Sequence, residues 1–329
     1  MLCRLPFPGS RQIIHPKIRE LRETVLKIAA VILNYQDAKG TVDALRRIDG
    51  FFCLDRIVLV DNASADGSAG ILEQEAENAS GRVPVTFVQS GRNGGYGAGN
   101  NLGVRTAAEL GADLVLIANP DAVFDEKLVK DMAAVFQWDP AAAVCGAVMH
   151  EGEDRRISWR EYLLSGWKRR KPAEAVLHGG PVMGRVLREH LDYSFAYYKK
   201  GEAERGRPQL VRVYAVHGSL LMVAASKFLE MGGFDEEMFL YGEENVLAEK
   251  ALRSGYPVYL LKETYRHAGS VSITGAGFGA VRRQKLRNQS ELCYYRKYLG
   301  MGKAGMAAAR LFQAVVMLET RIAERLHLI

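Results

Sequence analysis

Apolar runs that alternate with helix-length segments constrain the fold of this chain more than any other feature. Strands are predicted at Ile28–Tyr35, Arg56–Asp61, Val83–Gln89 and Asp113–Ala118. Helices are predicted between them, at about Ala38–Ile48, Gly67–Asn78 and Gly97–Leu110. Uninterrupted apolar runs indicate strands buried on both faces, and their alternation with helices indicates βαβ units. The sequence therefore predicts an α/β fold with a Rossmann-like, mostly parallel sheet flanked by helices.

The composition is that of an ordinary folded protein. Hydrophobic residues make up 48% of the 329 residues, charged residues 25%, and the net charge is +6. No CxxC pair occurs, which argues against a zinc site or disulfide framework and favours a reducing cytosol; the scattered cysteines are Cys3, Cys53, Cys145 and Cys293. We expect neither a signal peptide nor a spanning helix, because no apolar stretch approaches about 18 residues.

The pattern along the chain divides it into four regions. Residues 1–26 are an extension that ends in a short charged helix around Lys17–Lys27, and residues 27–150 hold the alternating elements, closing with a strand at Ala141–His150. Residues 151–272 begin with a basic, aromatic insertion, Glu151–Arg212, which includes the segments Trp167–Lys171 and Lys199–Gln209. Regular structure is expected again at Val213–Ala225, and a helix at Gly242–Ser254. Residues 273–329 are expected to be helical and basic.

Polar residues follow several of the predicted strands. Asn34, Asp61 and the trio Asn119-Pro120-Asp121 stand at strand ends. In parallel α/β sheets the carboxyl ends of the strands border the ligand crevice. The Asp121 carboxylate can bind a hard divalent cation that keeps water and phosphate as its other ligands. The alternative is a turn or cap that leads into a helix over Phe124–Trp138.

A glycine-rich segment, Gly91–Gly103, follows one strand and opens a helix. Backbone N–H groups in this position suit a phosphate. The glycines do not fit GxGxxG, and the chain has no GxxxxGK[ST], so a dehydrogenase and a Walker-type NTPase are disfavoured. The alternative interpretation is a tight turn with close helix packing.

Five carboxylates lie within ten residues of the segment Gly232–Asn245. Glu243 and Glu244 fall at the start of a predicted helix, where a partly desolvated Glu can act as a general base toward a sugar hydroxyl. A cluster of solvated acids is the alternative. The imidazole of His267, after a further strand, is either a metal ligand or proton carrier, or has no special role.

The order and spacing of these motifs resemble glycosyltransferase family 2, and most nearly its bacterial rhamnosyltransferase-like members. The resemblance covers about Lys27–Ser272 and rests on VILNY, VDNASADGS, GRNGGYGAGNNLG, ANPDA, GGFDEEMFLYGEEN and the late His267. It implies a GT-A fold in which residues 27–150 bind a nucleotide-diphosphate sugar and residues 151–272 supply the acceptor side. It also implies transfer with inversion, assisted by Mg²⁺ or Mn²⁺, to a glycan or lipid-linked saccharide in cell-surface polysaccharide synthesis.

The resemblance assigns donor-binding roles to matched positions. Asp61 is similar to the residue that meets the donor base, and Asn34 lies beside it. Asn93, Gly94 and Gly95 border the donor in this interpretation, because glycine backbone allows a close approach.

Metal and catalytic roles follow from the resemblance in the same way. Asn119 and Asp121 occupy the two acidic positions of the family's DxD-like element, with Asp121 expected to hold the metal. Asn119 in place of Asp is a frequent variant. His267 matches a late histidine that reaches the metal and the diphosphate. Glu244 falls where the family keeps its catalytic base, with Glu243 next to it.

Two positions depart from the family pattern. Many relatives have Glu-Asp where this chain has Glu243-Glu244, so the expected base is longer by one methylene group. Val246 replaces an acid common in relatives, which removes a candidate acceptor contact. The hypothesis from the sequence is an active enzyme with Glu244 as base.

The C-terminal segment Gly305–Ile329 is predicted to form an amphipathic basic helix. Its apolar residues recur at spacings of three and four: Ala308, Leu311, Val315, Leu318, Ile322 and Leu326. With Arg310, Arg321 and Arg325, this face either docks on the protein's own core or in a homodimer, or lies on an anionic membrane.

The leading prediction is an inverting, metal-dependent glycosyltransferase in the cytoplasm, either free or peripheral on the inner face of the cell membrane. A sugar nucleotidyltransferase and a catalytically decayed nucleotide-sugar or glycan-binding protein are the alternatives. The charge excess concentrates in residues 155–171 and at the C-terminal end, so nucleic acid is not an expected partner.

Overall fold

The computed structural model describes residues 26–79, 81–150, 162, 165–167, 169, 210–267 and 279–327. Most of the predicted N-terminal extension and of the insertion, including Lys199–Gln209, lies outside these residues. The helix predicted around Lys17–Lys27 does not include its last residue, Lys27, which has no helical structure. The carbonyl of Lys27 accepts the N–H groups of Asp113 and Leu114, so the chain enters the sheet at this point.

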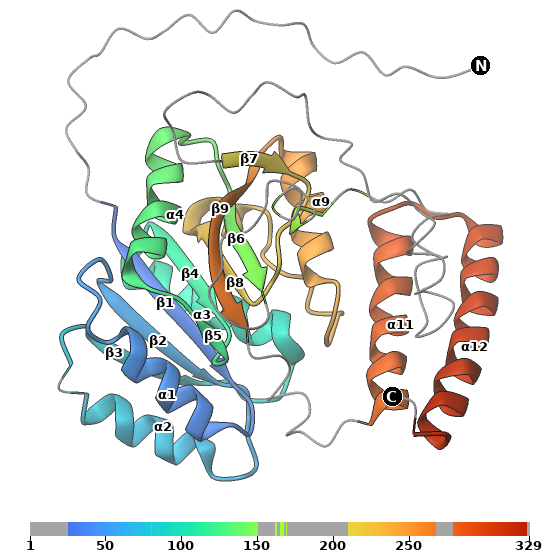
Figure 1. Ribbon diagram of the computed structural model, residues 1–329, viewed down its shortest axis with the longest axis horizontal. Coiled ribbons are helices and arrows are strands. Elements are labelled where there is room, and N and C mark those ends of the chain that lie inside the picture. The colour runs from blue at the N-terminus through green and yellow to red at the C-terminus, as the bar shows by residue number, and fades with distance from the viewer. Residues whose placement is uncertain are drawn as a thin grey trace, which may run out of the picture.

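One sheet of nine strands runs through the described residues (Figure 1). Its order is β3-β2-β1-β4-β8-β6-β9-β5, and β7 also pairs with β9. The strands are β1 (Ile28–Asn34), β2 (Arg56–Asp61), β3 (Val85–Gln89), β4 (Leu114–Ala118), β5 (Ala122–Val123), β6 (Val144–His150), β7 (Leu210–Val213), β8 (Leu220–Ala224) and β9 (Val258–His267). The first four strands of the order are parallel, β8 is antiparallel to both of its neighbours, and β6 and β9 are parallel again.

Helices cover both faces of this sheet (Figure 1). One face packs on α1 (Ala38–Ile48), α2 (Ser68–Glu77) and α4 (Glu126–Trp138), and the other on α3 (Gly95–Glu109), α8 (Ala225–Glu230) and α9 (Glu243–Ser254). Alternate residues of β1 serve the two layers, because Ala30 and Ile32 join the first cluster while Ala29 and Val31 join the second. Burial on both faces is the physical reason for the uninterrupted apolar run.

The first half of the chain confirms the predicted βαβ pattern. The bounds of α1 and β2 are those predicted, and the other predicted elements up to His150 differ by one to three residues. The short strand β5 was not predicted. The second half differs more. The predicted segment Val213–Ala225 is not one element, because β7 ends at Val213 and β8 begins at Leu220. The last strand is longer than its apolar core, so His267 lies within β9 rather than after it.

Two long C-terminal helices confirm the predicted helical extension. They are α11 (Ala280–Lys297) and α12 (Lys303–Arg325), which pack against each other. Tyr294, Tyr295 and Ala309 from this pair join Met238 and Val246 in a small apolar cluster. Val246, where relatives carry an acid, is fully buried there. No helix in the described part of the chain is long and apolar enough to span a bilayer.

Candidate functional site

Two buried polar side chains end the first two strands. The parallel register places Asn34 of β1 beside Asp61 of β2. Nδ2 of Asn34 donates to Oδ1 of Asp61 at 2.7 Å, and the Ser64 N–H donates to Oδ2 at 3.0 Å. Because protein donors hold both carboxylate oxygens, Asp61 is a fixed acceptor at the edge of the sheet. The role of the pair in binding a donor stays a prediction.

The glycine-rich segment is fastened to its surroundings by close backbone contacts. Oδ1 of Asn93 accepts the N–H of Gly95 and an amide hydrogen of Asn62, at 2.9 and 3.0 Å. Gly95 has φ +87°, and a Cβ there would lie 2.0 Å from the carbonyl oxygen of Phe239. Gly94 directly precedes the helix. Close packing therefore explains why glycine is needed at Gly95, whereas the donor contacts of Asn93, Gly94 and Gly95 remain a prediction.

The predicted metal pair is brought together by a short antiparallel pairing. Ala122 of β5 pairs with His267 of β9, so the neighbouring Asp121 faces the imidazole. Nε2 of His267 lies 3.1 Å from Oδ1 of Asp121, and both side chains are nearly buried. This nitrogen makes no hydrogen bond among the described residues. A buried nitrogen and a carboxylate oxygen that face each other without a hydrogen bond are suitable ligands for a shared cation.

This pair supplies only part of a coordination shell. Within the described residues, no group of three or more His, Cys, Asp or Glu side chains is arranged to hold a metal ion. Mg²⁺ and Mn²⁺ favour oxygen-rich sites, and Mg²⁺ commonly keeps waters and substrate phosphates as its other ligands. The residues present thus fit a cation that arrives together with a phosphate-bearing substrate. Asn119, the other position of the DxD-like element, anchors the strand end through its N–H, which donates to the Ser219 carbonyl at 2.9 Å.

A segment that the sequence analysis did not select, His217-Gly218-Ser219, lies at the centre of the site. The ring of His217 lies 5.8 Å from that of His267, centroid to centroid. Oγ of Ser219 bonds to Nδ1 of His217 at 2.8 Å and to the hydroxyl of Tyr265 at 2.6 Å. Burial, followed by the nearby His267, lowers the pKa of His217 to about 4. His217 is therefore neutral at neutral pH. The sequence feature that could have identified this segment is the one that identified Asn119: polar residues that follow an apolar run.

The two predicted acids stand at the start of α9. Tyr241 and Gly242 both have positive φ, +74° and +86°, and this turn directs the following residues inward. Oε1 of Glu244 accepts the N–H of Gly218 at 3.2 Å. Glu243 is 3% exposed, and its Oε1 has no hydrogen-bond partner among the described residues.

Burial decides the protonation of this pair. Burial, followed by the charge of Glu244, raises the pKa of Glu243 to about 8. Burial also raises the pKa of Glu244, although backbone N–H groups, including that of Gly218, oppose the shift. The helix N-terminus favours negative charge, but here desolvation is the larger effect. A carboxyl group with a pKa near neutrality is suited to proton transfer.

Tyr96 connects the glycine-rich segment to Gly218 and to the segment that leads to Glu243. Its hydroxyl donates to the Gly218 carbonyl at 2.6 Å, and its N–H donates to the Phe239 carbonyl at 3.0 Å. The sequence analysis missed Tyr96 as well, because an aromatic inside a glycine-rich stretch has no distinctive pattern. Glu244, His267 and Asn119, predicted from separate motifs, thus gather around His217-Gly218-Ser219, whereas Asn34, Asp61 and Asn93 make their contacts elsewhere.

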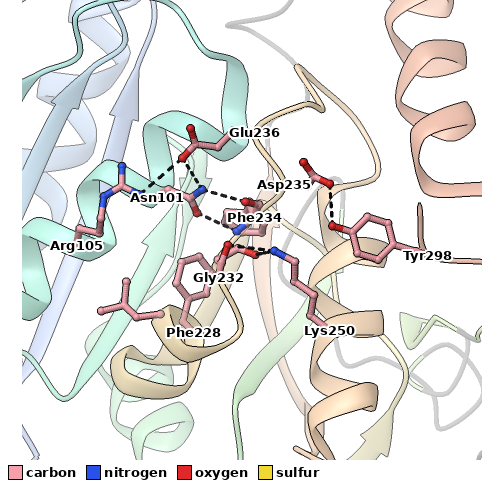
Figure 2. A pocket seen from close by; sticks show the side chains of 11 residues that line it. Asn101, Arg105, Phe228, Gly232, Phe234, Asp235, Glu236, Lys250 and Tyr298 are labelled. Atoms are coloured by element: carbon pink, nitrogen blue, oxygen red, sulfur yellow. Dashed lines mark hydrogen bonds and ion pairs between the residues drawn. The ribbon is translucent and has the colours of Figure 1, made fainter. Parts of the chain in front are cut away.

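The remaining acids of the 232–245 segment face away from this centre. Figure 2 shows two of them, Asp235 and Glu236, at a cavity between α3, α8, α9 and the end of α11. The volume of this cavity is about 440 Å³. Glu236 accepts from Asn101 at 3.0 Å, and Asp235 accepts from the hydroxyl of Tyr298 at 2.7 Å. Lys250 donates to the carbonyls of Gly232 and Gly233. None of the predicted site residues lines this cavity, so it is separate from the candidate active site.

Known structures share this architecture. A mannosyltransferase from Pyrobaculum calidifontis in complex with GDP-Man and Mn²⁺ aligns with 90% of this chain and 73% of its own, with a TM-score of 0.54 and 16% identity. GalNAc-T7 with UDP, GalNAc and Mn²⁺ aligns with 74% of this chain and 44% of its own, with a TM-score of 0.53 and 15% identity. The mixed, mostly parallel sheet with helices on both faces is a GT-A fold, as predicted.

Sequence comparison finds a similarity to one family. The model described as glycosyl transferase family 2 matches residues 31–187. Over these residues, somewhat less than half of its length, the chain is similar to glycosyltransferase family 2.

Two characterised relatives are similar over most of the chain. A low-salt glycan biosynthesis hexosyltransferase of Haloferax volcanii is 22% identical over 236 residues, which is 71% of this chain and 64% of the relative. An N-acetylglucosaminyl-diphospho-decaprenol L-rhamnosyltransferase of Mycobacterium tuberculosis is 27% identical over 214 residues, 61% of this chain and 62% of the relative. The matches therefore span less than two thirds of either relative's length.

Proposed function

We propose that the chain is an inverting, divalent-metal-dependent glycosyltransferase. It transfers a sugar, with rhamnose as the leading candidate, from a nucleotide-diphosphate donor to a glycan or lipid-linked saccharide in cell-surface polysaccharide synthesis. The observation that carries the proposal is the convergence on His217-Gly218-Ser219 of two pairs: the acids Glu243 and Glu244, and the ligands Asp121 and His267.

The chemistry needs a base on one side of the sugar and charge neutralisation on the other. An acceptor hydroxyl oxygen forms a bond to the anomeric carbon, and the bond from that carbon to the diphosphate breaks. Glu244 takes the hydroxyl proton, a contribution of roughly 10²–10⁴-fold in rate. The nucleoside diphosphate leaves with the bonding electron pair. Attack from the face opposite the leaving group inverts the anomeric configuration.

Asp121 and His267 would hold the cation, with Mg²⁺ and Mn²⁺ both compatible with such a site. A bound divalent ion neutralises the charge that develops on a departing diphosphate. The buried Nε2 of His267, which makes no hydrogen bond in the part of the chain that the structure describes, and the facing carboxylate of Asp121 support this assignment. The neutral imidazole of His217 lies beside them and adds no positive charge that would repel the ion.

The relatives suggest the substrates. The mycobacterial relative is named as a rhamnosyltransferase that acts on N-acetylglucosaminyl-diphospho-decaprenol, and the haloarchaeal one as a hexosyltransferase of glycan biosynthesis. The 27% identity to the first favours rhamnose and a lipid-linked acceptor. We place the protein in the cytoplasm at the inner face of the membrane, and the free thiols of Cys53, Cys145 and Cys293 support a reducing compartment.

A thermal-shift panel of nucleotide sugars, with and without Mn²⁺, tests the proposal, because a ligand stabilises the fold by RT ln(1 + [L]/Kd). The best donor is then incubated with enzyme, metal and lipid-linked saccharide, and the products are resolved. Glycosylated acceptor and free nucleoside diphosphate are the expected products. Release of sugar 1-phosphate, from cleavage between the two phosphates, would indicate nucleotidyl transfer instead, and donor binding without turnover would indicate a binding protein with decayed catalysis.

A further inference from the structure

The C-terminal helix α12 carries a solvent-exposed apolar stripe. Its members are Leu311 (71% exposed), Val315 (44%), Leu318 (58%), Ile322 (50%) and Leu326 (62%). Their spacings of three and four residues place them on one face of the helix. Single exposed apolar residues are ordinary on a protein surface, but a continuous stripe of five marks a contact site.

The stripe is not the face that holds α12 to the protein. Ala309, Val316 and Ala323 are buried, and they lie on the side of the helix that faces α11. Figure 1 shows α12 as the outermost element, with α11 between it and the sheet. Because α12 is already fixed through this other side, the apolar stripe is left to face outward.

Positive charge flanks the stripe. Arg310, Arg321 and Arg325 are exposed on α12, and none of the helix's exposed residues is acidic. Residues 279–327 contain ten Lys and Arg against three Asp and Glu, whereas the whole chain has 44 against 38. The helical pair alone accounts for the net positive charge of the protein.

This surface is also joined to the candidate active site. Oγ of Ser290 in α11 donates to the Leu240 carbonyl at 2.8 Å, in the segment that leads to Glu243 and Glu244. Lys297 forms an ion pair with Asp235 at 3.0 Å in the same segment. Any external surface to which α12 binds is therefore held in a fixed position relative to the proposed catalytic base.

We propose that α12 lies in the headgroup region of an anionic membrane, with the stripe among the acyl chains and the three arginines at lipid phosphates. Charge complementarity favours this occupant. A second copy of the chain would bring the same positive charge to the contact, whereas an anionic bilayer neutralises it. The proposal of membrane binding depends only on the properties of this surface. A second step, in which membrane binding brings a lipid-linked acceptor toward Glu244, rests on the proposed function as well.

Co-sedimentation of the full chain with vesicles tests the proposal. Vesicles of pure phosphatidylcholine are compared with vesicles containing phosphatidylglycerol, at low and high salt. We expect binding to the anionic vesicles only, weakened by salt. The double variant Leu311→Ser/Leu318→Ser should bind more than about tenfold more weakly. The triple variant Arg310→Gln/Arg321→Gln/Arg325→Gln should lose the preference for anionic lipid.

The matched control is Ile71→Ser/Leu110→Ser, which removes two exposed apolar residues (49% and 44%) from other helices and should bind as the parent does. Equal sedimentation of the parent and the α12 double variant would overturn the proposal. So would a parent that is dimeric by light scattering, becomes monomeric in that variant and does not bind vesicles, because the stripe would then hold a second copy. Donor hydrolysis without vesicles is measured in parallel. If it is absent while binding follows the pattern above, the proposed function fails and the membrane surface stands.

Discussion

Glu243 and Glu244 are neighbours in the chain but have different surroundings. Glu244 is partly exposed and accepts an N–H from Gly218, whereas Glu243 is buried and its Oε1 has no hydrogen-bond partner in the described ranges. A base needs access to the acceptor hydroxyl as well as a suitable pKa. These surroundings support the proposal that Glu244 is the base and that Glu243 is the buried group that keeps the Glu244 environment poorly solvated.

Replacing Glu244 should remove the base with little change in shape. We expect Glu244→Gln to lower kcat by roughly 10²–10⁴-fold and to leave donor binding intact. Turnover and the donor-induced thermal shift are measured together. Glu237→Gln is the matched control, because Glu237 lies in the same segment, is 59% exposed and faces α11. Full activity of Glu244→Gln would exclude its assignment.

The raised pKa of Glu243 makes stability depend on pH. Its pKa rises from an ordinary 4.5 to about 8 in the folded protein, so the folded state holds the proton more tightly than the unfolded state. This contribution to stability is complete below about pH 4.5 and is lost as pH rises through about 8. Glu243→Gln cannot titrate. The Tm of the parent should therefore fall relative to that of Glu243→Gln between about pH 5 and pH 8.5. Parallel curves would contradict the prediction.

Asp121 gives the third prediction at this scale. Asp121→Asn keeps the shape of the side chain and removes its charge, so the Mn²⁺-dependent part of the stabilisation by nucleoside diphosphate should disappear. The control Asp43→Asn changes an exposed aspartate that pairs with Lys39, and it should keep the full metal effect. An unchanged Mn²⁺ response in Asp121→Asn would place the ion elsewhere.

At the scale of elements, the parts governed by local pattern were predictable and the parts governed by distant contacts were not. The strands β1, β2 and β4 are buried on both faces, so their uninterrupted apolar composition predicted them. The insertion of β8 between β4 and β6, antiparallel to both, depends on chain reversal over long separations and leaves no local signature.

The candidate site also has residues that local pattern predicts and residues whose placement depends on distant contacts. Asn34, Asp61 and Asp121 were found because strand ends are a general rule. The different locations of Glu244 and Asp235 could not be predicted from the sequence. Asp235 accepts a hydrogen bond from the hydroxyl of Tyr298, sixty-three residues further along the chain, and no local pattern indicates so distant a partner.

The glycine-rich helix start allows a sharp test of packing. Gly95→Ala would place a carbon 2.0 Å from the Phe239 carbonyl oxygen, on a backbone with φ +87°. We expect a loss of more than about 3 kcal/mol in the free energy of unfolding. Gly70→Ala is the matched control in α2, where a Cβ has nothing within 4 Å, and it should stabilise by about 0.5–1 kcal/mol. Urea unfolding measures both, and equal stabilities would contradict the described contact.

At the scale of the whole molecule, side chains of α11 attach the helical pair α11 and α12 to the rest of the GT-A fold. Tyr214 near β7 bonds to Tyr294 at 2.8 Å, and Asp235 accepts from Lys297 and Tyr298. Asp235 is 9% exposed, and these partners hold its pKa below the ordinary value despite its burial. The contact is therefore a paired, nearly buried carboxylate rather than a surface ion pair.

Removing the partners of Asp235 should loosen this attachment. Lys297→Met/Tyr298→Phe leaves a nearly buried carboxylate with fewer donors, so we expect a loss of about 1–3 kcal/mol. Arg296→Met is the control, because Arg296 pairs with the 59% exposed Glu237 and should contribute less than about 1 kcal/mol. Thermal unfolding measures both. A double variant as stable as the control would show that the attachment depends on the apolar cluster alone.

The backbone contact between the start of α3 and Phe239 has a mechanical consequence. The N–H of Tyr96 donates to the Phe239 carbonyl, and Gly95 lies in contact with the same peptide group. The start of helix α3 and the segment that leads to Glu244 are therefore held together directly by backbone contacts. A ligand that moved the start of α3 would press on the peptide group of Phe239, so we expect the two segments to shift together.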